Sequence, residues 1–428
     1  MRRIDALVAA MTGSGGPGAA VGVSRRGEMV YQGCFGLADV EWRQPVTPDT
    51  VFALASLSKP LTATTVVLLA RDGLINLDAA VGDYLPDYAG PGRVALIRHL
   101  LTHTSGIPNF LTLPGFRDDA AHLDHTPAGL TEVFAALPLE FPPGTRYGYS
   151  NSGYRLLDII IEKVTGTPFA EVIAERLFRP AGMGSARLLT DRAVIPWRAR
   201  GYELAADGHL AAARHLSMTI AGGAGGLAAS LQDMLAFDQA MREHALVTPP
   251  EERRMRTPTP LASGRTEGYG MGWVLSKYQG TPVVSHAGGI DGFSCFYARF
   301  PERDTSLIIL SNRHAFPCHY LARKITDEIL DLPSHVAPAT PSGPVPAGLA
   351  GTYRDSLDAA QVSVTGDRLV VSHAGRTYRM IPAGPAAYTD ENDPGTRLRV
   401  HASGLQPAVI TIDYPFTWFT GYRSPDDP

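Results

Sequence analysis

The chain has 428 residues, which is enough for two or three domains with a large hydrophobic core. Charged residues make up 19% of it and the formal net charge is −4, so it offers neither a basic field for nucleic acid nor a polybasic signal for a membrane surface. The three cysteines, Cys34, Cys295 and Cys318, are odd in number and show no Cys-x-x-Cys spacing, which argues against a disulfide framework and against a zinc site.

The N-terminal segment shows no secretory signal. Residues 2–11 have the pattern of a short amphipathic helix, and Ile4 to Met11 contains Asp5 and is too short and polar for the apolar core of a signal peptide. The longest apolar stretch, Val66 to Ala70, cannot span a bilayer. These features favour a cytoplasmic protein. A β-hairpin is predicted next, with strands at Ala19–Ser24 and Met29–Cys34.

The following apolar segment leads into Ser56-Leu57-Ser58-Lys59 and then into a helical run from Thr62 to Arg71. Residues three apart share one face of a helix, so Ser56 and Lys59 are predicted to lie roughly 5–6 Å apart. A serine hydroxyl needs a base that takes its proton, and an amine can serve when burial lowers its pKa. Lys59 is one of only four lysines and its neighbours are apolar. We therefore interpret Ser56 as a nucleophile with Lys59 beside it, rather than as a helix cap followed by a solvated side chain.

From Pro60 to about Leu246 the pattern is mostly helical, and strand patterns return afterwards. An amphipathic helix over Tyr320–Leu330 closes this region. The economical assembly is an α/β (α+β) fold: one antiparallel sheet built from both ends of residues 1–332, flanked by helices, with a large helical insertion in the middle. The expected helices are Leu96–Leu101, Leu130–Leu137, Tyr154–Val164, Phe169–Leu177 and Leu231–Arg242, and the expected strands are Tyr269–Leu275, Pro282–Ser285, Phe293–Phe300 and Thr305–Ser311.

The C-terminal part differs from the rest of the chain in composition and in hydrophobic pattern. Residues 333–347 contain five prolines with serine and threonine between them, which predicts a semi-rigid linker. Strand patterns follow at Gln361–Ser372, Val409–Tyr414 and Phe416–Tyr422, so residues 348–428 are predicted to form a small β domain.

Two further motifs carry chemistry. Tyr149-Ser150-Asn151 lies in a turn-rich loop before a helix, where a phenol and an amide two residues apart project to the same side of an extended backbone. Ser285-His286-Ala287-Gly288-Gly289 is a strand that runs into glycines, a pattern typical of close approach by a ligand. Ser372-His373-Ala374-Gly375 repeats the tetrapeptide, but there a hairpin tip explains it. We favour His286, because only that motif belongs to the sheet region that carries Ser56.

Taken in order, Ser56-x-x-Lys59, Tyr149-Ser150-Asn151 and His286-Ala287-Gly288 resemble the three motifs of the serine β-lactamase and penicillin-binding-protein family, in its class C-like branch. The resemblance covers roughly residues 5–332, since Leu100–Pro108, Gly225–Leu227 and Tyr269–Trp273 match as well. His286 departs from the lysine that opens the third motif in true β-lactamases. Histidine there is similar to family esterases, D-aminopeptidases and peptide cyclases, which argues against β-lactamase activity. Residues 348–428 resemble the small lipocalin-like barrels appended to some of those enzymes.

The resemblance implies that Ser56 attacks an ester or amide carbonyl and forms an acyl-enzyme. Lys59 and Tyr149 would share the proton transfers, and either of them can be the resting base. The backbone N–H groups of Ser56 and Gly289 would hold the oxyanion.

On the same basis, Asn151 would orient Lys59 and a substrate amide, and His286 and Gly288 would line the substrate side. No metal and no organic cofactor are implied. The expected partner is a small-molecule or peptide substrate, with no nucleic acid and no membrane, and the oligomeric state is left open.

The expected function is a serine hydrolase of the D-aminopeptidase or esterase type. A transacylase or peptide cyclase, which passes the acyl group to an amine, is the alternative within the same chemistry. A β-lactamase, a D,D-carboxypeptidase and a non-catalytic acyl sensor are less favoured.

Overall fold

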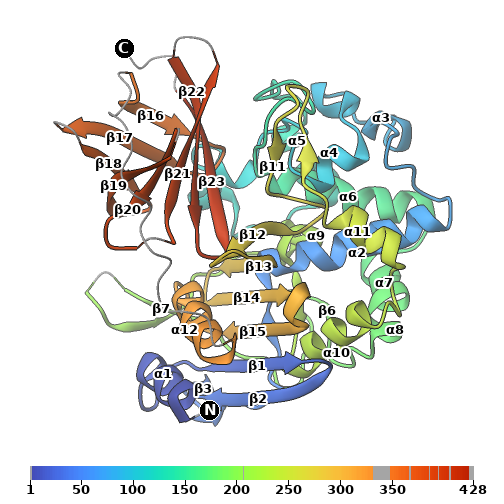
Figure 1. The fold of residues 1–428 in the computed structure, drawn as a ribbon. Coiled ribbons are helices and arrows are strands. Elements are labelled where there is room, and N and C mark those ends of the chain that lie inside the picture. Colours follow the sequence, from blue (N-terminus) through green and yellow to red (C-terminus); the bar gives the residue numbers. More distant parts are fainter. Residues whose placement is uncertain are drawn as a thin grey trace.

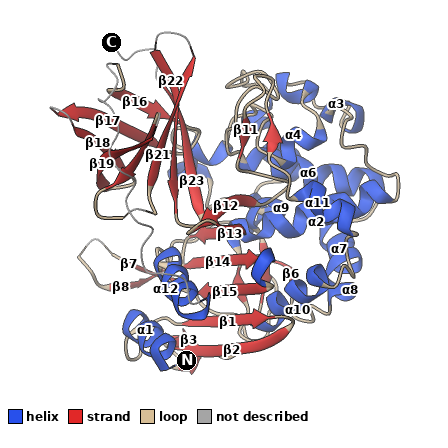
Figure 2. Ribbon diagram, in the orientation of Figure 1, coloured by secondary structure: helices blue, strands red, loops and turns tan. Residues whose placement is uncertain are grey.

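The computed structural model describes residues 2–205, 207–330, 348–365, 368–384, 386–393, 395–403 and 406–423. A sheet with helices on its faces occupies one part of the molecule, and an all-β barrel lies beside the β12 edge of that sheet (Figures 1 and 2). The predicted α/β class with a second, small β unit is confirmed. The proline-rich segment 333–347 lies outside the described residues, and the predicted division at 332 and 348 stays a prediction.

The central sheet has six antiparallel strands in the order β12-β13-β14-β15-β1-β2, so it is built from both ends of the first 330 residues, as expected. Arg26 (φ 54°) and Gly27 (φ 81°) form the two-residue turn between β1 and β2, and positive φ at both positions suits the right-handed twist of a hairpin. The strands are β1 Ala19–Arg25, β2 Glu28–Phe35, β12 Val274–Tyr278, β13 Thr281–Ile290, β14 Phe293–Phe300 and β15 Thr305–Ser311.

One predicted strand is wrong. Tyr269–Leu275 was expected to be extended throughout, but β12 begins only at Val274. Gly272 (φ 78°) turns the chain onto the helix that follows Ser56, where an added Cβ would lie 2.9 Å from Lys59 O. The segment before β12 therefore packs against the helix that carries Lys59 and does not extend the sheet. β13 in turn is longer than predicted, because its strand continues through Gly288 and Gly289.

Helices cover both faces of the sheet. Alternate side chains of each strand point to opposite faces, and both faces carry apolar side chains that must be buried. α1 and α12 pack over the face that carries Val21 and Phe296, and α2 and α10 pack over the face that carries Ala20 and Tyr297. The helices are α1 Arg2–Thr12, α2 Ser58–Arg71, α3 Val81–Tyr84, α4 Ile97–Leu101, α5 Pro127–Ala135, α6 Asn151–Thr165, α7 Phe169–Ile173, α8 Arg179–Ala181, α9 Gly222–Gly225, α10 Leu231–Arg242, α11 Pro249–Met255 and α12 Cys318–Leu330.

Short strands hold the insertion together. β9 pairs with both β5 and β6, so the segment before Ser56 is tied to the segment after α9. The short strands are β3 Leu37–Asp39, β4 Gln44–Pro45, β5 Phe52–Ala53, β6 Arg187–Leu188, β7 Tyr202–Leu204, β8 Leu210–Ala212, β9 Leu227–Ala229, β10 Thr259–Pro260 and β11 Thr266–Glu267.

The C-terminal strands close into an eight-stranded antiparallel barrel, in agreement with the predicted lipocalin-like domain. Its interior is filled by apolar side chains such as Tyr353, Leu398 and Ile412, which are fully buried. The strands are β16 Gly351–Arg354, β17 Ala359–Thr365, β18 Arg368–His373, β19 Arg376–Gly384, β20 Ala387–Asp390, β21 Arg397–Ser403, β22 Gln406–Tyr414 and β23 Thr417–Arg423.

The barrel is joined to the sheet region through the β22–β23 turn. Phe416 enters the core on the α12 face, where its ring stacks on Tyr278 at 4.7 Å and meets Phe296 at 5.5 Å. Ser285 Oγ donates a hydrogen bond to Phe416 O at 3.0 Å. The barrel thus contributes a core residue to the region that carries the predicted catalytic motifs.

Candidate active site

Ser56 lies in a tight 3₁₀ turn, η1 (Ala55–Leu57), between β5 and α2. Ala55 has φ 49°, a left-handed conformation that costs free energy for a residue with a side chain and that often marks a functional position. Ser56 is half-buried although the residues on either side of it are buried. η1 packs against β13, and an added Cβ on Gly288 would lie 2.1 Å from Leu54 O. Glycine there lets the strand approach the nucleophile closely.

Lys59, one turn later in α2, is completely buried. Its Nζ lies 3.1 Å from Ser56 Oγ, 2.8 Å from Asn151 Oδ1 and 2.7 Å from Ala224 O. Burial lowers the pKa of Lys59 well below its ordinary value, because desolvation penalises the ammonium. Two of the three neighbouring oxygens can only accept hydrogen bonds. A neutral amine that donates to both of them directs its lone pair toward Ser56 Oγ, which is the geometry of a base.

Tyr149 is a neighbour of both groups: its phenol hydrogen-bonds with Ser56, and Lys59 Nζ lies 4.7 Å from its ring centroid. Burial raises the pKa of the Tyr149 phenol, and a hydrogen bond with Ser56 opposes that rise only in part. The phenol is therefore protonated at neutral pH. In that form it can relay a proton or donate a hydrogen bond.

Asn151 is the first residue of α6, and it is fixed by a residue that the motifs did not identify. Both the backbone N and the Nδ2 of Asn151 donate to Asn109 Oδ1 at 3.2 Å. Because Nδ2 is used in this way, the carbonyl oxygen of the amide points at Lys59. Ser150 caps α6 by accepting from Gly153 N at 3.4 Å.

His286 lies on β13 and is 4% exposed. Nδ1 is 2.7 Å from Ala287 O, which can only accept, so Nδ1 carries the proton and Nε2 accepts from the Tyr269 hydroxyl at 2.9 Å. Burial and the nearby Lys59 lower the pKa of His286 to about 3. The ring is neutral at physiological pH, and both of its nitrogens are already bonded within the protein.

Gly289 is exposed, and a Cβ there would meet no atom within 4 Å. Gly289 pairs with Ser294 of β14, whereas β12 pairs with β13 only as far as Ser285. The part of β13 from His286 onward therefore has a side that β12 leaves uncovered and that η1 approaches.

His103 was not singled out from the sequence, although the Leu100–Pro108 stretch contains it. Its Nδ1 accepts from Ser150 N at 3.2 Å, and its ring lies 4.1 Å from the ring of Tyr149 and 4.8 Å from that of Tyr269. Burial lowers the pKa of His103 well below its ordinary value. A neutral, packed imidazole thus sets the position of the Tyr149 loop.

The site's remaining support comes from α9, which carries the Ala224 carbonyl. Asp158 accepts from Gly223 N at 2.7 Å, and the Thr62 hydroxyl donates to Gly223 O at 2.8 Å. Asp158 also pairs with Arg155, and both side chains are buried. This buried ion pair fixes the turn that receives a hydrogen bond from Lys59.

The barrel reaches the same loop from outside. Ser356 Oγ donates to Tyr149 O at 3.0 Å, the Tyr422 hydroxyl accepts from Tyr147 N at 3.3 Å, and the Trp418 ring packs on Tyr147 at 4.7 Å. His373, the competing histidine, lies at the end of β18 in the predicted hairpin and bonds to Tyr414 at 2.7 Å. It takes no part in the Ser56 cluster.

Comparison with known proteins identifies the family of this chain. Residues 4–328 match the family model described as Beta-lactamase. The chain belongs to the β-lactamase family. Within the part of this family member that the structure describes, no helix is long and apolar enough to cross a membrane, and no group of three or more His, Cys, Asp or Glu side chains is placed to hold a metal ion.

Two curated relatives and one solved structure illustrate the likeness. Penicillin-binding protein 4* of Bacillus subtilis (strain 168) is 32% identical over 310 residues, covering 67% of this chain and 66% of that protein. The D-aminopeptidase of Gluconobacter oxydans (strain 621H) is 30% identical over 366 residues, covering 82% and 66%. The chain thus spans slightly less than two thirds of both relatives. The crystal structure of SurE superposes with a TM-score of 0.69 at 25% identity over 98% of this chain and 97% of that one.

Proposed function

We propose that this β-lactamase-family protein is a serine hydrolase that cleaves amide or ester bonds through an acyl-enzyme on Ser56, with D-amino-acid amides or peptides as its substrates. The observation that carries the proposal is the buried Lys59 amine, whose pKa burial lowers, 3.1 Å from a half-buried Ser56 hydroxyl. The D-aminopeptidase relative supports the choice of substrate.

In the proposed reaction Lys59 takes the Ser56 proton as Oγ attacks the carbonyl carbon. The Ser56 and Gly289 N–H groups hold the oxyanion, on the side of β13 that β12 leaves uncovered. The proton on Lys59 then passes through Tyr149 to the leaving amine as the C–N bond breaks. Water attacks the acyl carbonyl and gives a proton to Lys59, and Ser56 Oγ takes a proton back as the C–Oγ bond breaks. The neutral His286, whose nitrogens are both bonded, offers no charge to a substrate carboxylate. This favours substrates without a carboxylate beside the scissile bond.

The test is a labelling and turnover experiment. A fluorophosphonate should modify the Ser56 peptide of the wild type and leave Ser56→Ala unlabelled, as seen by mass spectrometry. D-alanine amide should be hydrolysed with steady-state turnover, and Ser56→Ala should lose about 10⁴-fold or more in kcat. A label on Ser105 or Ser150, both buried beside the site, would refute the assignment of the nucleophile.

The transacylase alternative predicts a different product. If an added amine captures the acyl group in preference to water, the products with and without that amine will differ while Ser56 labelling stays the same. A burst of one equivalent without turnover would instead indicate an acyl sensor.

A further inference from the structure

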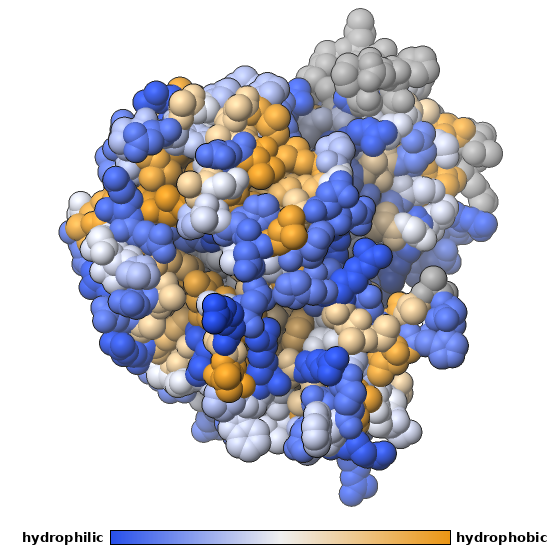
Figure 3. Space-filling model, turned by 180° about the vertical axis from the view of Figure 1, so that it is seen from behind, coloured by the Kyte–Doolittle hydropathy of each residue, from blue (hydrophilic) through white to orange (hydrophobic). Residues whose placement is uncertain are grey.

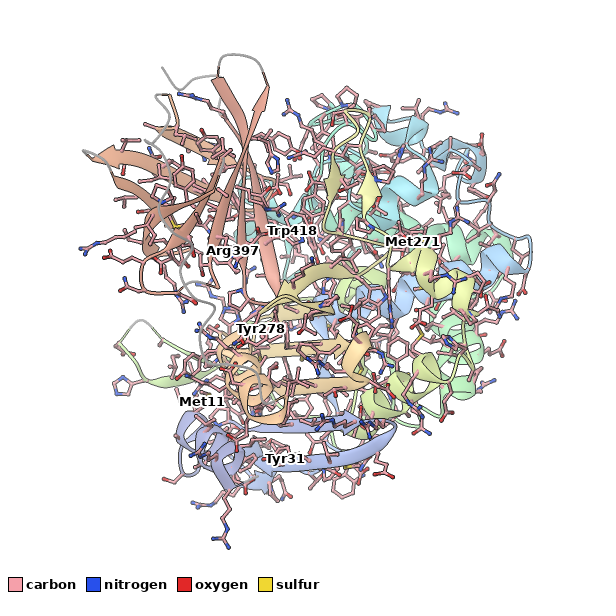
Figure 4. The ribbon with its side chains drawn as sticks, viewed as in Figure 1. Met11, Tyr31, Met271, Tyr278, Arg397 and Trp418 are labelled. Carbon is pink, nitrogen blue, oxygen red and sulfur yellow. The ribbon has the colours of Figure 1, made fainter. Side chains whose placement is uncertain are left out.

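A large cleft lies between the outer wall of the barrel and the sheet region, away from Ser56. Its volume is about 1150 Å³, and its walls come from α11, β11 and β12 on one side and from β20 to β23 on the other. Arg397 and Trp418 mark the side of the barrel that faces the sheet (Figure 4). Among the described residues that line the cleft, none is Ser56, Lys59, Tyr149, Asn151 or His286.

The cleft is cationic although the chain as a whole is acidic. Six lining side chains are basic, whereas three are carboxylates, Glu252, Glu267 and Asp413. The net charge of −4 makes this excess of positive charge a local feature of the cleft. The six basic residues are Arg253, Arg256, Arg265, Lys277, Arg397 and Arg399.

Each carboxylate neutralises one arginine. Glu252 lies 2.6 Å from Arg256, Glu267 lies 2.5 Å from Arg265, and Asp413 lies 2.7 Å from Arg399. These three ion pairs leave three cations unneutralised.

The remaining cations are Arg253, Lys277 and Arg397. They come from α11, β12 and β21, so both walls of the cleft contribute. In the part of the chain that the structure describes, no carboxylate lies within 4 Å of any of them, and all three are exposed.

We propose that this cleft binds a multivalent anion, a small molecule or short chain that carries two or more phosphate or carboxylate groups. Exposed cations that line a concave surface attract and hold such groups by charge-assisted hydrogen bonds. Because Arg253 and Lys277 belong to the sheet-region wall and Arg397 to the barrel wall, a ligand with two or more anionic groups has a cation to bind on each wall. The site is independent of the reaction assigned to Ser56.

The experiment measures binding of sodium tripolyphosphate and of citrate by isothermal titration calorimetry at constant ionic strength, with acetate as a monovalent comparison. The wild type should bind at least one of the two multivalent anions saturably and acetate more weakly. Lys277→Ala/Arg397→Ala removes one cation from each wall, and we expect its Kd to rise about tenfold or more. Lys163→Ala/Arg25→Ala removes the same charge from exposed sites outside the cleft and should leave the Kd unchanged.

Two results would overturn the proposal. Absence of saturable binding of both anions is one, and an equal loss in both double variants is the other, since it would mean a response to net charge. Protein labelled at Ser56 with a fluorophosphonate should bind the anion with the same Kd. Loss of binding on labelling would place the anion at the catalytic serine and would refute a separate site.

Discussion

At the scale of single residues, the decisive feature is the protonation state of two buried bases. Lys59 and His286 are both desolvated: burial lowers the pKa of Lys59 well below its ordinary value and, together with the nearby Lys59, lowers that of His286 to about 3. For Lys59 this favours the neutral amine, whose lone pair can accept the Ser56 proton. For His286 it removes the positive charge that a lysine at this position would offer to a substrate carboxylate.

The first prediction concerns pH. Lys59 acts in its neutral form, so kcat/KM should rise with pH through the lowered pKa of Lys59 and level off well below the ordinary lysine value. An ester such as p-nitrophenyl acetate is the substrate to use, because it has no titrating group. In Asn151→Asp a carboxylate replaces the amide oxygen that lies 2.8 Å from Lys59 Nζ. The carboxylate favours the charged form of Lys59, so the rise of kcat/KM should move to higher pH by about one unit or more.

His286 provides the control for this measurement. Because its pKa is about 3, His286 should cause no change in kcat/KM near pH 6.5. In His286→Gln, kcat/KM should rise over the same pH range as in the wild type. An unshifted profile in Asn151→Asp would exclude Lys59 as the titrating base.

The second prediction concerns the substrate carboxylate. The wild type should hydrolyse a D-amino-acid amide with a higher kcat/KM than the matched dipeptide that has a free carboxylate. His286→Lys introduces a charge, and since charge-assisted bonds are roughly twice as strong as neutral ones, the ratio should move toward the carboxylate by about tenfold. His286→Gln removes the hydrogen bond with Tyr269 without adding a charge, so it should leave the ratio of the two kcat/KM values unchanged. Equal turnover of both substrates by the wild type would show that the anion is recognised by other means.

At the scale of elements, the site depends on how five elements converge. η1 and α2 carry Ser56 and Lys59, the start of α6 carries Asn151, α9 supplies the Ala224 carbonyl and β13 supplies the glycines. The Arg155–Asp158 pair joins α6 to α9 and is buried between them.

The third prediction tests this pair. Asp158→Ala leaves the buried Arg155 without its partner and Gly223 N without its acceptor, so it should lower the free energy of unfolding by about 3–5 kcal/mol. Arg155→Met/Asp158→Leu removes both charges and should cost less than Asp158→Ala alone. Urea denaturation followed by circular dichroism measures both. If the double variant is less stable than Asp158→Ala, the ion pair stabilises the fold by more than the free energy that desolvating its two charges costs.

At the scale of the whole molecule, the barrel contacts the rest of the protein at two places: the hydrophobic core on the α12 face of the sheet and the loop of residues 147–149. Phe416 fills a place in the core on the α12 face, and Ser356, Trp418 and Tyr422 contact residues 147–149. Seen from behind, the surface is mostly hydrophilic with apolar residues scattered over it in patches (Figure 3).

The fourth prediction follows from the loop contacts. Ser356→Ala removes a bond to the Tyr149 carbonyl, and the freer loop should lower kcat several-fold with little change in KM or in thermal stability. Ser363→Ala, which changes an exposed barrel serine, is the matched control. A higher KM with an unchanged kcat would indicate that Ser356 contacts the substrate and does not position Tyr149.

Much of the fold could be predicted because local patterns encode it. The hairpin over β1 and β2, the strands β14 and β15, and the helix α10 follow from alternation, helical periodicity and turn residues. The strand expected at Tyr269 failed because the packing of Gly272 on α2 overrides a local strand pattern, and that contact is visible only in three dimensions.

By itself, the sequence determined the order of the three motifs, the choice of His286 over His373 and the presence of a β unit after the proline-rich segment. The tertiary structure alone decided which atoms meet. Lys59 is buried between Asn151 and Ala224, and both His286 nitrogens are occupied. Asn109, His103 and Ser356 hold the segment that carries Tyr149, Ser150 and Asn151. The physical reason is that a pKa or a hydrogen bond depends on desolvation and on the distance between residues far apart in the chain. Local spacing along the sequence carries neither quantity.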